Sequence, residues 1–253
     1  MNDSSTKSSV VPGVALVTGA SGGIGRATAM RLATLGASVI VAYNSRREAA
    51  EEVVASLPGG GHMALRVAIE DTASVTEAAR KIESRHGRLD VLVNNGGTTH
   101  PVPANDFDAL TDEIFDRIVT VNLRGPFAVV RAFRPLLERS DRAAVVNVSS
   151  IAARTGVGSS LAYCAAKGGL DTLTVGLAKV LAPKIRVFSV SPAGVDTDFV
   201  PGRSHEQLEA TAQKMPLRKI TSADDVAAAV VACVTELTSS TGIIIPVDEG
   251  RHL

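Results

Sequence analysis

The stretch Val14-Ala15-Leu16-Val17-Thr18-Gly19-Ala20-Ser21-Gly22-Gly23-Ile24-Gly25 places a cluster of glycines directly after a short apolar run. The apolar run predicts a buried strand, and the residues from Gly25 to Leu35 predict a helix. Glycines between a strand and a helix allow positive φ and let phosphate oxygens approach backbone N–H groups. The helix dipole adds a positive end at the same point. The spacing Gly-x-x-x-Gly-x-Gly in this setting therefore predicts a turn that binds a pyrophosphate.

Outward from this turn, strand-like and helix-like segments alternate almost to the end of the chain. Regular alternation implies right-handed βαβ crossovers and a single α/β domain with a doubly wound parallel sheet, the Rossmann fold. The expected strands are Ala15–Val17, Ser38–Ala42, Met63–Val67, Val91–Val93, Ala144–Val148, Arg186–Val190 and Ile243–Pro246. The expected helices are Gly25–Leu35, Arg47–Leu57, Ser74–His86, Thr111–Leu137, Tyr163–Leu181 and Ser222–Glu236. Thr221 and Asp224 have the spacing of a capping box before the last helix.

Two segments depart from this regular pattern. Residues 1–12 are polar and rich in serine, and we expect them to be disordered, with residues 13–253 forming the dinucleotide-binding domain. Residues 198–220 are long and irregular, and they follow a strand at its carboxyl end, where α/β folds bind ligands. A loop of this length at this place favours a substrate lid.

The composition excludes several classes of protein. The formal net charge is zero and no block of like charge occurs, so neither nucleic acid nor an anionic membrane is an expected partner. The N-terminus lacks the apolar core of a signal peptide, and no apolar run approaches the roughly 20 residues that span a bilayer. Cys164 and Cys233 have no metal-ligand spacing, and we expect buried thiols, no metal and a cytoplasmic protein.

The choice of cofactor depends on the end of the second expected strand. An acidic residue there binds the 2′-OH of NAD, but this chain has Tyr43-Asn44-Ser45-Arg46-Arg47 and no acid before Glu48. Guanidinium groups and hydroxyls suit a 2′-phosphate, which a carboxylate would repel. The alternative is that Arg46 and Arg47 are a solvated helix start, although cations are disfavoured at that end of a helix. We predict NADP(H) rather than NAD(H).

A second motif carries the chemistry. Tyr163 and Lys167 are four residues apart, which places them on one face of a helix. A buried ammonium near a phenol favours the phenolate and is expected to lower the pKa of Tyr163 toward neutrality, which makes it a general acid or base. Ser150, which follows the strand Ala144–Val148, would donate a second hydrogen bond to the substrate oxygen.

With these residues the chain resembles the classical short-chain dehydrogenases/reductases, in particular the 3-oxoacyl-acyl-carrier-protein reductases, from Val14 to Gly250. The matching motifs are Thr18–Gly25, Asn94-Asn95-Gly96-Gly97, Val121-Asn122-Leu123, Asn147-Val148-Ser149-Ser150, Tyr163 with Lys167, Pro192–Thr197 and Pro246-Val247-Asp248. The departures are Ala68 where an aspartate usually contacts the adenine amine, Gly96 before Gly97 where the third motif residue is usually alanine, and Ala193 where glycine is common.

The resemblance implies roles for individual residues. Tyr163 would exchange the proton, Ser150 would orient the carbonyl, Lys167 would hold the nicotinamide ribose, and Asn122 would support a water that links Lys167 to solvent. Ordinary backbone bonding is the alternative for Asn122 and Asn94. The implied catalytic residues are Asn122, Ser150, Tyr163 and Lys167, and the implied cofactor-binding residues are Gly19, Ser21, Gly23, Ile24, Gly25, Asn44, Ser45, Arg46, Ile69, Asn94, Gly96, Tyr163, Lys167, Pro192, Val195 and Thr197.

The resemblance also suggests which residues face the substrate. His100 is either a hydrogen-bonding group or an ordinary turn histidine, and Arg154 either binds a carboxylate or anchors its own loop. Basic residues at Lys184, Arg139 and Arg142 either dock an acidic carrier protein or are solvated surface charge. The residues expected to face the substrate are His100, Ala152, Arg154, Val157, Ala193, Phe199 and Met215.

These expectations combine into one function and two alternatives. The expected function is NADPH-dependent reduction of a ketone or aldehyde to an alcohol. The alternatives are an NAD-linked alcohol dehydrogenase and a catalytically idle NADP-sensing regulator on the same fold. The helices Thr111–Leu137 and Tyr163–Leu181 are apolar on more than one face, which favours subunit contacts, and the resemblance implies a homotetramer. The residues cited for this face are Phe127, Val130, Leu173 and Leu177.

Overall fold

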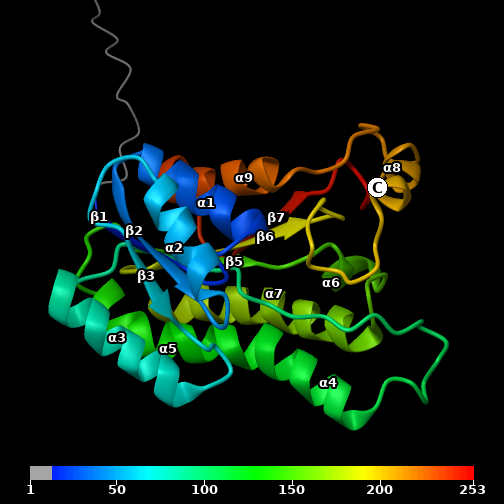
Figure 1. Ribbon diagram of the computed structural model, residues 1–253, viewed down its shortest axis with the longest axis horizontal. Coiled ribbons are helices and arrows are strands. Elements are labelled where there is room, and N and C mark those ends of the chain that lie inside the picture. The colour runs from blue at the N-terminus through cyan, green and yellow to red at the C-terminus, as the bar shows by residue number, and fades with distance from the viewer. Residues whose placement is uncertain (1–12) are drawn as a thin grey trace, which may run out of the picture.

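The seven strands found within residues 13–253 lie in one sheet, in the order β3-β2-β1-β4-β5-β6-β7 (Figure 1). Every neighbouring pair is parallel. The structure, a computed structural model, describes residues 13–253, and the segment 1–12 expected to be disordered lies outside them. The sheet confirms the α/β doubly wound fold. Its strands are β1 (Gly13–Val17), β2 (Ala37–Tyr43), β3 (Met63–Arg66), β4 (Val91–Asn94), β5 (Ala144–Val148), β6 (Arg186–Pro192) and β7 (Ile243–Val247).

Helices cover both faces of the sheet, and each face has its own apolar core (Figure 1). α1, α2 and α9 pack on one face, and α3, α5 and α7 pack on the other. The helix bounds are α1 (Gly23–Thr34), α2 (Arg47–Ser56), α3 (Thr72–His86), α4 (Asp112–Val119), α5 (Gly125–Leu137), α6 (Ala152–Thr155), α7 (Leu161–Leu181), α8 (His205–Ala212) and α9 (Ala223–Thr235). Most of them differ from the expected bounds by one or two residues, as helix ends often do.

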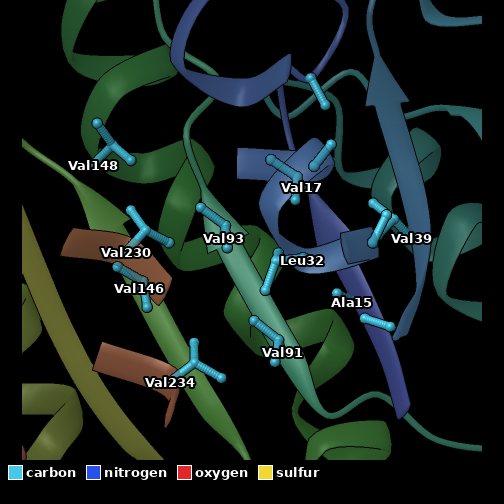
Figure 2. Close-up of a cluster of buried hydrophobic side chains, with 14 of the residues drawn as sticks. Ala15, Val17, Leu32, Val39, Val91, Val93, Val146, Val148, Val230 and Val234 are labelled. Carbon is cyan, nitrogen blue, oxygen red and sulfur yellow. The ribbon is translucent and has the colours of Figure 1, made fainter. Parts of the chain in front are cut away.

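The central strands β1, β4 and β5 are mainly apolar because both of their faces are buried. In β1, Ala15 and Val17 face the core under α1 and α9, whereas Val14 and Leu16 face the opposite core. This alternation follows from the two-residue period of a strand, and a continuous apolar run is typical of a parallel sheet between two helical layers. Figure 2 shows the first core, with the side chain of Leu32 from α1 among the valines of the central strands.

The expected helix over residues 111–137 is wrong as a single element. It is α4, then a π-helical turn over Thr120–Arg124, then α5. Two residues explain the interruption. Pro126 has no N–H to donate to the carbonyl of Asn122, and the Asn122 side chain donates to the carbonyl of Ile118 at 2.8 Å. A π turn inside a helix often marks a functional site.

The expectation of a wholly irregular segment at 198–220 is also wrong, because the segment contains α8. Ser204 and Gln207 form a capping box at its start, a local signal that does not depend on hydrophobic periodicity. The capping box of α9 is formed by Ser222 and Asp225, one residue later than expected. Thr221 is instead buried and forms an isolated parallel bridge with Val195. This bridge joins the two ends of the segment.

The strand order places the functional region. The connections from β1 and β4 lead to opposite sides of the sheet, and such a switch point leaves a crevice at the carboxyl ends of the strands. The glycine turn follows β1, and the turn that starts at Asn95 follows β4. Within residues 13–253, no helix has the length and apolar character needed to cross a membrane.

Candidate active site

The turn between β1 and α1 is shaped by its glycines. Gly19 and Gly23 have φ of 63° and 52°, which confirms the positive φ expected of this turn. Gly25 is required for a different reason, because a Cβ there would lie 2.4 Å from the carbonyl oxygen of Gly19. Asn95 secures the turn, since its Nδ2 donates to the carbonyl oxygens of Thr18 at 2.9 Å and Gly19 at 3.1 Å. The turn therefore exposes backbone rather than side chains.

The start of α1 fits the phosphates of a dinucleotide. No side chain caps this helix, and its first turn contains no acidic residue. Gly22, Gly23 and Ile24 line a cavity of about 740 Å³. The first N–H groups of a helix lack intrahelical acceptors, and together with the dipole they favour an anion. Since Gly22 and Gly23 add no side chain to this end of the cavity, the residues present fit a pyrophosphate.

The end of β2 presents one arginine to the cavity and turns the other away. Arg46 lines the cavity, and its guanidinium lies against Gly22, where a Cβ would be 3.4 Å from Nη2. Arg47 pairs with Glu51 at 2.8 Å along the surface of α2. Asn44 does not line the cavity, because its Nδ2 donates to the Oε1 of Glu70 at 2.9 Å. Only Arg46 is placed to meet a 2′-phosphate.

The side chain of Asn94, which was expected beside the cofactor, does not line the cavity. Asn94 is buried, and its Nδ2 donates to the Oδ1 of Asn147 at 2.9 Å. Asn147 in turn donates to the Oγ1 of Thr174 at 2.8 Å, so these side chains tie β4, β5 and α7 together. The neighbouring Asn95 lines the cavity instead. A strand alternates its faces, so two adjacent asparagines at its end cannot both face the same way.

Ser150, Tyr163 and Lys167 meet on one wall of the cavity. α7 brings Tyr163 and Lys167 to one helix face, as their spacing predicted, with Nζ of Lys167 5.6 Å from the centroid of the Tyr163 ring. Lys167 is buried, and its Nζ donates to the carbonyl oxygen of Val148 at 2.8 Å. Ser150 stands just beyond β5 and interacts with the Tyr163 hydroxyl. A serine hydroxyl and a phenol thus share one site, with a buried amine behind them.

The surrounding side chains do not lower the pKa of Tyr163 as expected. Burial raises the pKa of Tyr163 to about 12, although the hydrogen bond with Ser150 and the charge of Arg203 act in the opposite direction. Burial also lowers the pKa of Lys167 to about 8, against the attraction of Asp171. Desolvation penalises the charged form of each group, and here it outweighs the charges nearby. Tyr163 is therefore a protonated phenol at neutral pH.

Asn122 lies away from the cavity, in the π-helical turn. Its Nδ2 donates to the carbonyl oxygens of Thr98 and Ile118, both at 2.8 Å, and its Oδ1 accepts from the Thr98 N–H at 3.3 Å. The Asn122 side chain thus forms hydrogen bonds with backbone atoms, which was the alternative to a role at the cofactor. Its carbonyl lacks the usual helical donor four residues on, because that residue is Pro126. Asn122 joins the loop after β4 to the break in the helix.

The cavity brings together most of the residues expected at the cofactor. Ile69 does not reach it, because it packs beneath Gly96, where a Cβ would be 3.3 Å from its Cδ1. The cavity is lined by Gly19, Gly23, Ile24, Arg46, Gly96, Tyr163, Lys167, Pro192, Val195 and Thr197 of that set. It is not lined by Ser21, Gly25, Asn44, Ser45, Ile69 or Asn94.

Some of the residues that were expected to face the substrate line the main cavity, and others do not. His100 lines a separate hollow of about 360 Å³ with Arg117, and Arg154 is exposed outside both cavities. Residues of the segment 198–220 and of the C-terminal turn were missed, including Arg203 and Arg251, because only the folded chain brings them to the cavity. The substrate-facing residues that do line the main cavity are Ala152, Val157, Ala193, Phe199 and Met215. Residues 13–253 contain no group of three side chains arranged to hold a metal ion.

Comparison with known proteins agrees with this architecture. The family model described as enoyl-(acyl carrier protein) reductase matches residues 19–252. A Streptomyces violaceoruber protein named as ketoacyl reductase 2 of the granaticin polyketide synthase is 37% identical over 247 residues, which cover 95% of this chain and 96% of the relative. The 3-oxoacyl-acyl-carrier-protein reductase of Staphylococcus aureus is 32% identical over 243 residues, which cover 94% of this chain and 98% of the relative.

A solved structure from Burkholderia xenovorans, described as a short-chain dehydrogenase/reductase, superposes with a TM-score of 0.89. It is 34% identical in sequence, and the match covers 95% of this chain and 98% of that chain. The sequence and structural matches extend over nearly the whole chain, so they include both the glycine turn and the wall that carries Tyr163. The chain belongs to the short-chain dehydrogenase/reductase family of NAD(P)-dependent oxidoreductases, which act on CH–OH and C=O groups.

Proposed function

We propose that the protein reduces a ketone or aldehyde to an alcohol with NADPH, and that Tyr163 is its general acid. The observation that carries the proposal is one cavity that has a phosphate-binding turn at one end and the hydroxyls of Ser150 and Tyr163 at the other. Bound NADPH would supply the hydride. The residues of the chain then have to orient the carbonyl and deliver one proton to its oxygen.

Ser150 and Tyr163 divide that task. The hydroxyl of Ser150 donates a hydrogen bond that holds the carbonyl oxygen, and the hydroxyl of Tyr163 gives its proton to the same oxygen as the carbon is reduced. Burial raises the pKa of Tyr163 to about 12, so the phenol holds the proton that the carbonyl oxygen requires. In the reverse direction the phenolate would accept a proton from an alcohol.

Lys167 stabilises the charge that this transfer leaves on Tyr163. With a pKa of about 8, Lys167 is mainly an ammonium ion at pH 7, and its charge lies close to the tyrosine ring. The family resemblance adds that Lys167 holds the nicotinamide ribose and that Asn122 supports a water behind it. The Asn122 side chain is already engaged, so we assign the water to the main-chain carbonyl of Asn122.

NADPH is preferred over NADH in this proposal because of Arg46. Its guanidinium lies at the glycine turn and lines the cavity, where a 2′-phosphate would form a charge-assisted hydrogen bond with it. No acid precedes Glu48 at the end of β2, the position where an acidic residue would bind the 2′-OH of NAD. Dissociation constants within threefold of each other for the two cofactors would contradict this part of the proposal.

The family model is described by a reduction of C=C bonds, whereas the two relatives are named for reduction of an oxo group. The site favours the oxo group. Ser150 and Tyr163 converge as two hydroxyl donors, and an oxygen that gains negative charge on the reacting carbon makes use of both. An enoyl thioester that is turned over faster than any ketone would reverse this assignment.

The test follows NADPH oxidation with aldehydes, ketones, quinones, sugars and 3-oxoacyl thioesters as substrates. Turnover that is lost in Tyr163→Phe supports the reductase, and the best substrate identifies the class. Turnover that persists in this variant refutes the role of Tyr163. Faster alcohol oxidation with NAD than ketone reduction with NADPH would favour the NAD-linked dehydrogenase, and tight NADPH binding without turnover would favour the sensor.

We also propose that the protein is a cytoplasmic homotetramer. Fewer of the residues expected at subunit contacts are available for them. Val130 and Leu177 are buried in the core of their own chain, so they are not available for subunit contacts. Phe115 of α4 and Phe127 of α5 remain 39% and 40% exposed. Large exposed aromatic side chains favour an interface. Sedimentation equilibrium should give four times the monomer mass, and a monomer at micromolar concentration would contradict the assembly.

A further inference from the structure

Arg203 is a cation in the cavity that has no acidic partner. It lies between β6 and α8 and lines the cavity, and its Nη2 donates to the carbonyl oxygen of Val195 at 2.5 Å. Its Nε is buried without a hydrogen-bond partner. None of the ion pairs within residues 13–253 includes Arg203. A guanidinium that is partly buried and incompletely bonded is costly unless an anion completes its set of bonds.

A second cation, Arg251, lines the same cavity from the C-terminal turn. This turn is held against the segment after α8, because the Leu217 N–H donates to the carbonyl of Glu249 at 3.1 Å. A Cβ on Gly250 would lie 2.8 Å from Pro216, so the two stretches are in close contact. Figure 1 shows the C-terminus beside α8. The fold thus brings two arginines to one wall from positions that are far apart in the sequence.

The charges around this wall do not balance. Asp198 is the one acidic residue among the described residues that line the cavity. Asp196 lies nearby, but it accepts a hydrogen bond from His205 at 2.7 Å. Burial lowers the pKa of Arg203, the charges of Asp196 and Tyr163 raise it, and the charge of Arg251 lowers it. Among the groups that line the cavity at this wall, two arginines face one carboxylate, and a bound carboxylate would complete the hydrogen bonds of Arg203.

The wall lies beside the proposed reacting group. Phe199 contacts Tyr163, with ring centroids 6.0 Å apart, and Arg203 follows four residues later. Nη1 of Arg203 would be 3.4 Å from a Cβ on Gly194, in the strand-end segment that also lines the cavity. The charge of Arg203 is close enough to influence Tyr163. A group held by Arg203 would therefore lie close to a carbonyl held at Tyr163.

We propose that the substrate is an oxo acid whose carboxylate binds Arg203, with Arg251 adding a second positive charge at the rim of the cavity. This proposal rests on the proposed function for the position of the carbonyl. The substrate would carry a free carboxylate a few bonds from its carbonyl carbon. A guanidinium matches a carboxylate with two parallel hydrogen bonds, which gives orientation as well as affinity.

The test measures binding separately from turnover. Cyclohexanecarboxylate and the neutral cyclohexanecarboxamide, which have nearly the same shape, are titrated by calorimetry into the protein with and without saturating NADPH. We expect the carboxylate to bind about 10- to 100-fold more tightly, the range of a charge-assisted hydrogen bond. The preference should largely disappear in Arg203→Met, return in part in Arg203→Lys, and fall less in Arg251→Met. Arg142→Met removes an exposed arginine outside the cavity and should leave the preference unchanged.

Two results of the comparison between acid and amide would overturn the proposal. One is equal affinity of the wild-type protein for the acid and the amide. The other is a preference that survives in both Arg203→Met and Arg251→Met. Arg251 is exposed near the chain end, so its variant remains informative if Arg203→Met does not fold. A higher NADPH dissociation constant in Arg203→Met, with the acid preference intact, would assign Arg203 to the cofactor and likewise overturn it.

Turnover then distinguishes the two proposals. 4-Oxocyclohexanecarboxylate and its methyl ester are compared as substrates with NADPH. A kcat/KM for the acid at least tenfold above that of the ester, reduced to near unity in Arg203→Met, supports both proposals. Equal turnover of acid and ester supports the reductase and counts against the oxo acid. Binding of the acid through Arg203 without any turnover supports the anion site and counts against the proposed reduction.

Discussion

The two ends of the cavity are built in different ways. The nucleotide end is formed by backbone, because the glycine turn after β1 is closed by hydrogen bonds from Asn95 and rests on the central strands. The substrate end is formed by side chains from the segment 198–220 and the C-terminal turn. The difference shows that binding a common cofactor requires a fixed backbone, whereas the choice of substrate requires side chains that differ without disturbing the sheet.

Stability differs between the two ends as well. Gly25 and the strands beneath it are buried in the main core, but α8 buries only Leu208 and Ala212. The substrate segment is otherwise held by the bridge between Val195 and Thr221 and by its contact with the C-terminal turn. Segments with few buried apolar contacts open at a lower free energy than the core. The substrate end is therefore expected to open while the nucleotide end stays closed.

The largest expected effect belongs to Tyr163, which stands between the two ends. Tyr163→Phe should reduce kcat by about 10²- to 10⁴-fold, because it removes the proton donor and leaves the packing of the ring in place. The NADPH dissociation constant, measured by fluorescence, should stay within twofold of the wild-type value. Tyr43→Phe changes the only other tyrosine and should leave kcat unaltered. Equal losses in the two variants would argue against a catalytic hydroxyl.

Two glycine-to-alanine substitutions, one in α1 and one in α7, test whether the nucleotide end of the cavity depends on the backbone. Gly25→Ala should weaken NADPH binding more than about tenfold and destabilise the fold by about 1–3 kcal/mol, because its Cβ would meet the carbonyl of Gly19. The Cβ that Gly176→Ala adds in α7 would have no neighbouring atom within 4 Å, so this substitution should stabilise the fold by about 0.5–1 kcal/mol. Urea unfolding and NADPH titration measure both. Unchanged NADPH affinity in Gly25→Ala would contradict the claim.

Cofactor preference should respond to Arg46 by a smaller amount. Arg46→Ala should raise the dissociation constant of NADPH by about tenfold, the effect of one charge-assisted hydrogen bond, and leave that of NADH unchanged. Arg47→Ala is the matched control, since Arg47 pairs with Glu51 on the surface of α2. A loss in the control as large as in Arg46→Ala would indicate that net charge, rather than one contact, sets the preference.

The smallest effect is expected at the start of α8. The pKa of His205 is raised, first by its hydrogen bond with Asp196 and then by the charges of Asp196 and Glu209. A raised folded-state pKa adds stability that is complete below the unfolded value of about 6.5 and is lost as pH rises through the folded value. His205→Asn should therefore lower Tm most at mildly acid pH. A difference that grows with pH would contradict this sign.

The sequence predicted the fold well, since apolar runs and glycines between them depend on local geometry. The parallel sheet, the positive φ at Gly19 and Gly23, and the common face of Tyr163 and Lys167 all follow from spacing of a few residues. Prediction failed where a single residue altered a local pattern. Pro126 interrupted a long amphipathic helix, and a capping box formed α8 in a segment with no clear period.

The sequence by itself determined that this chain has a parallel sheet, a glycine turn between its first strand and helix, and a tyrosine–lysine pair on one helix face. Each of these depends on residues close together in the chain, whose geometry is set by backbone sterics and helical period. Only the tertiary structure decided that Asn94 is buried while Asn95 faces the cavity, that burial raises the pKa of Tyr163, and that Arg203 and Arg251 share a wall. Burial and long-range electrostatics depend on every element that packs around a group, and no local pattern records them.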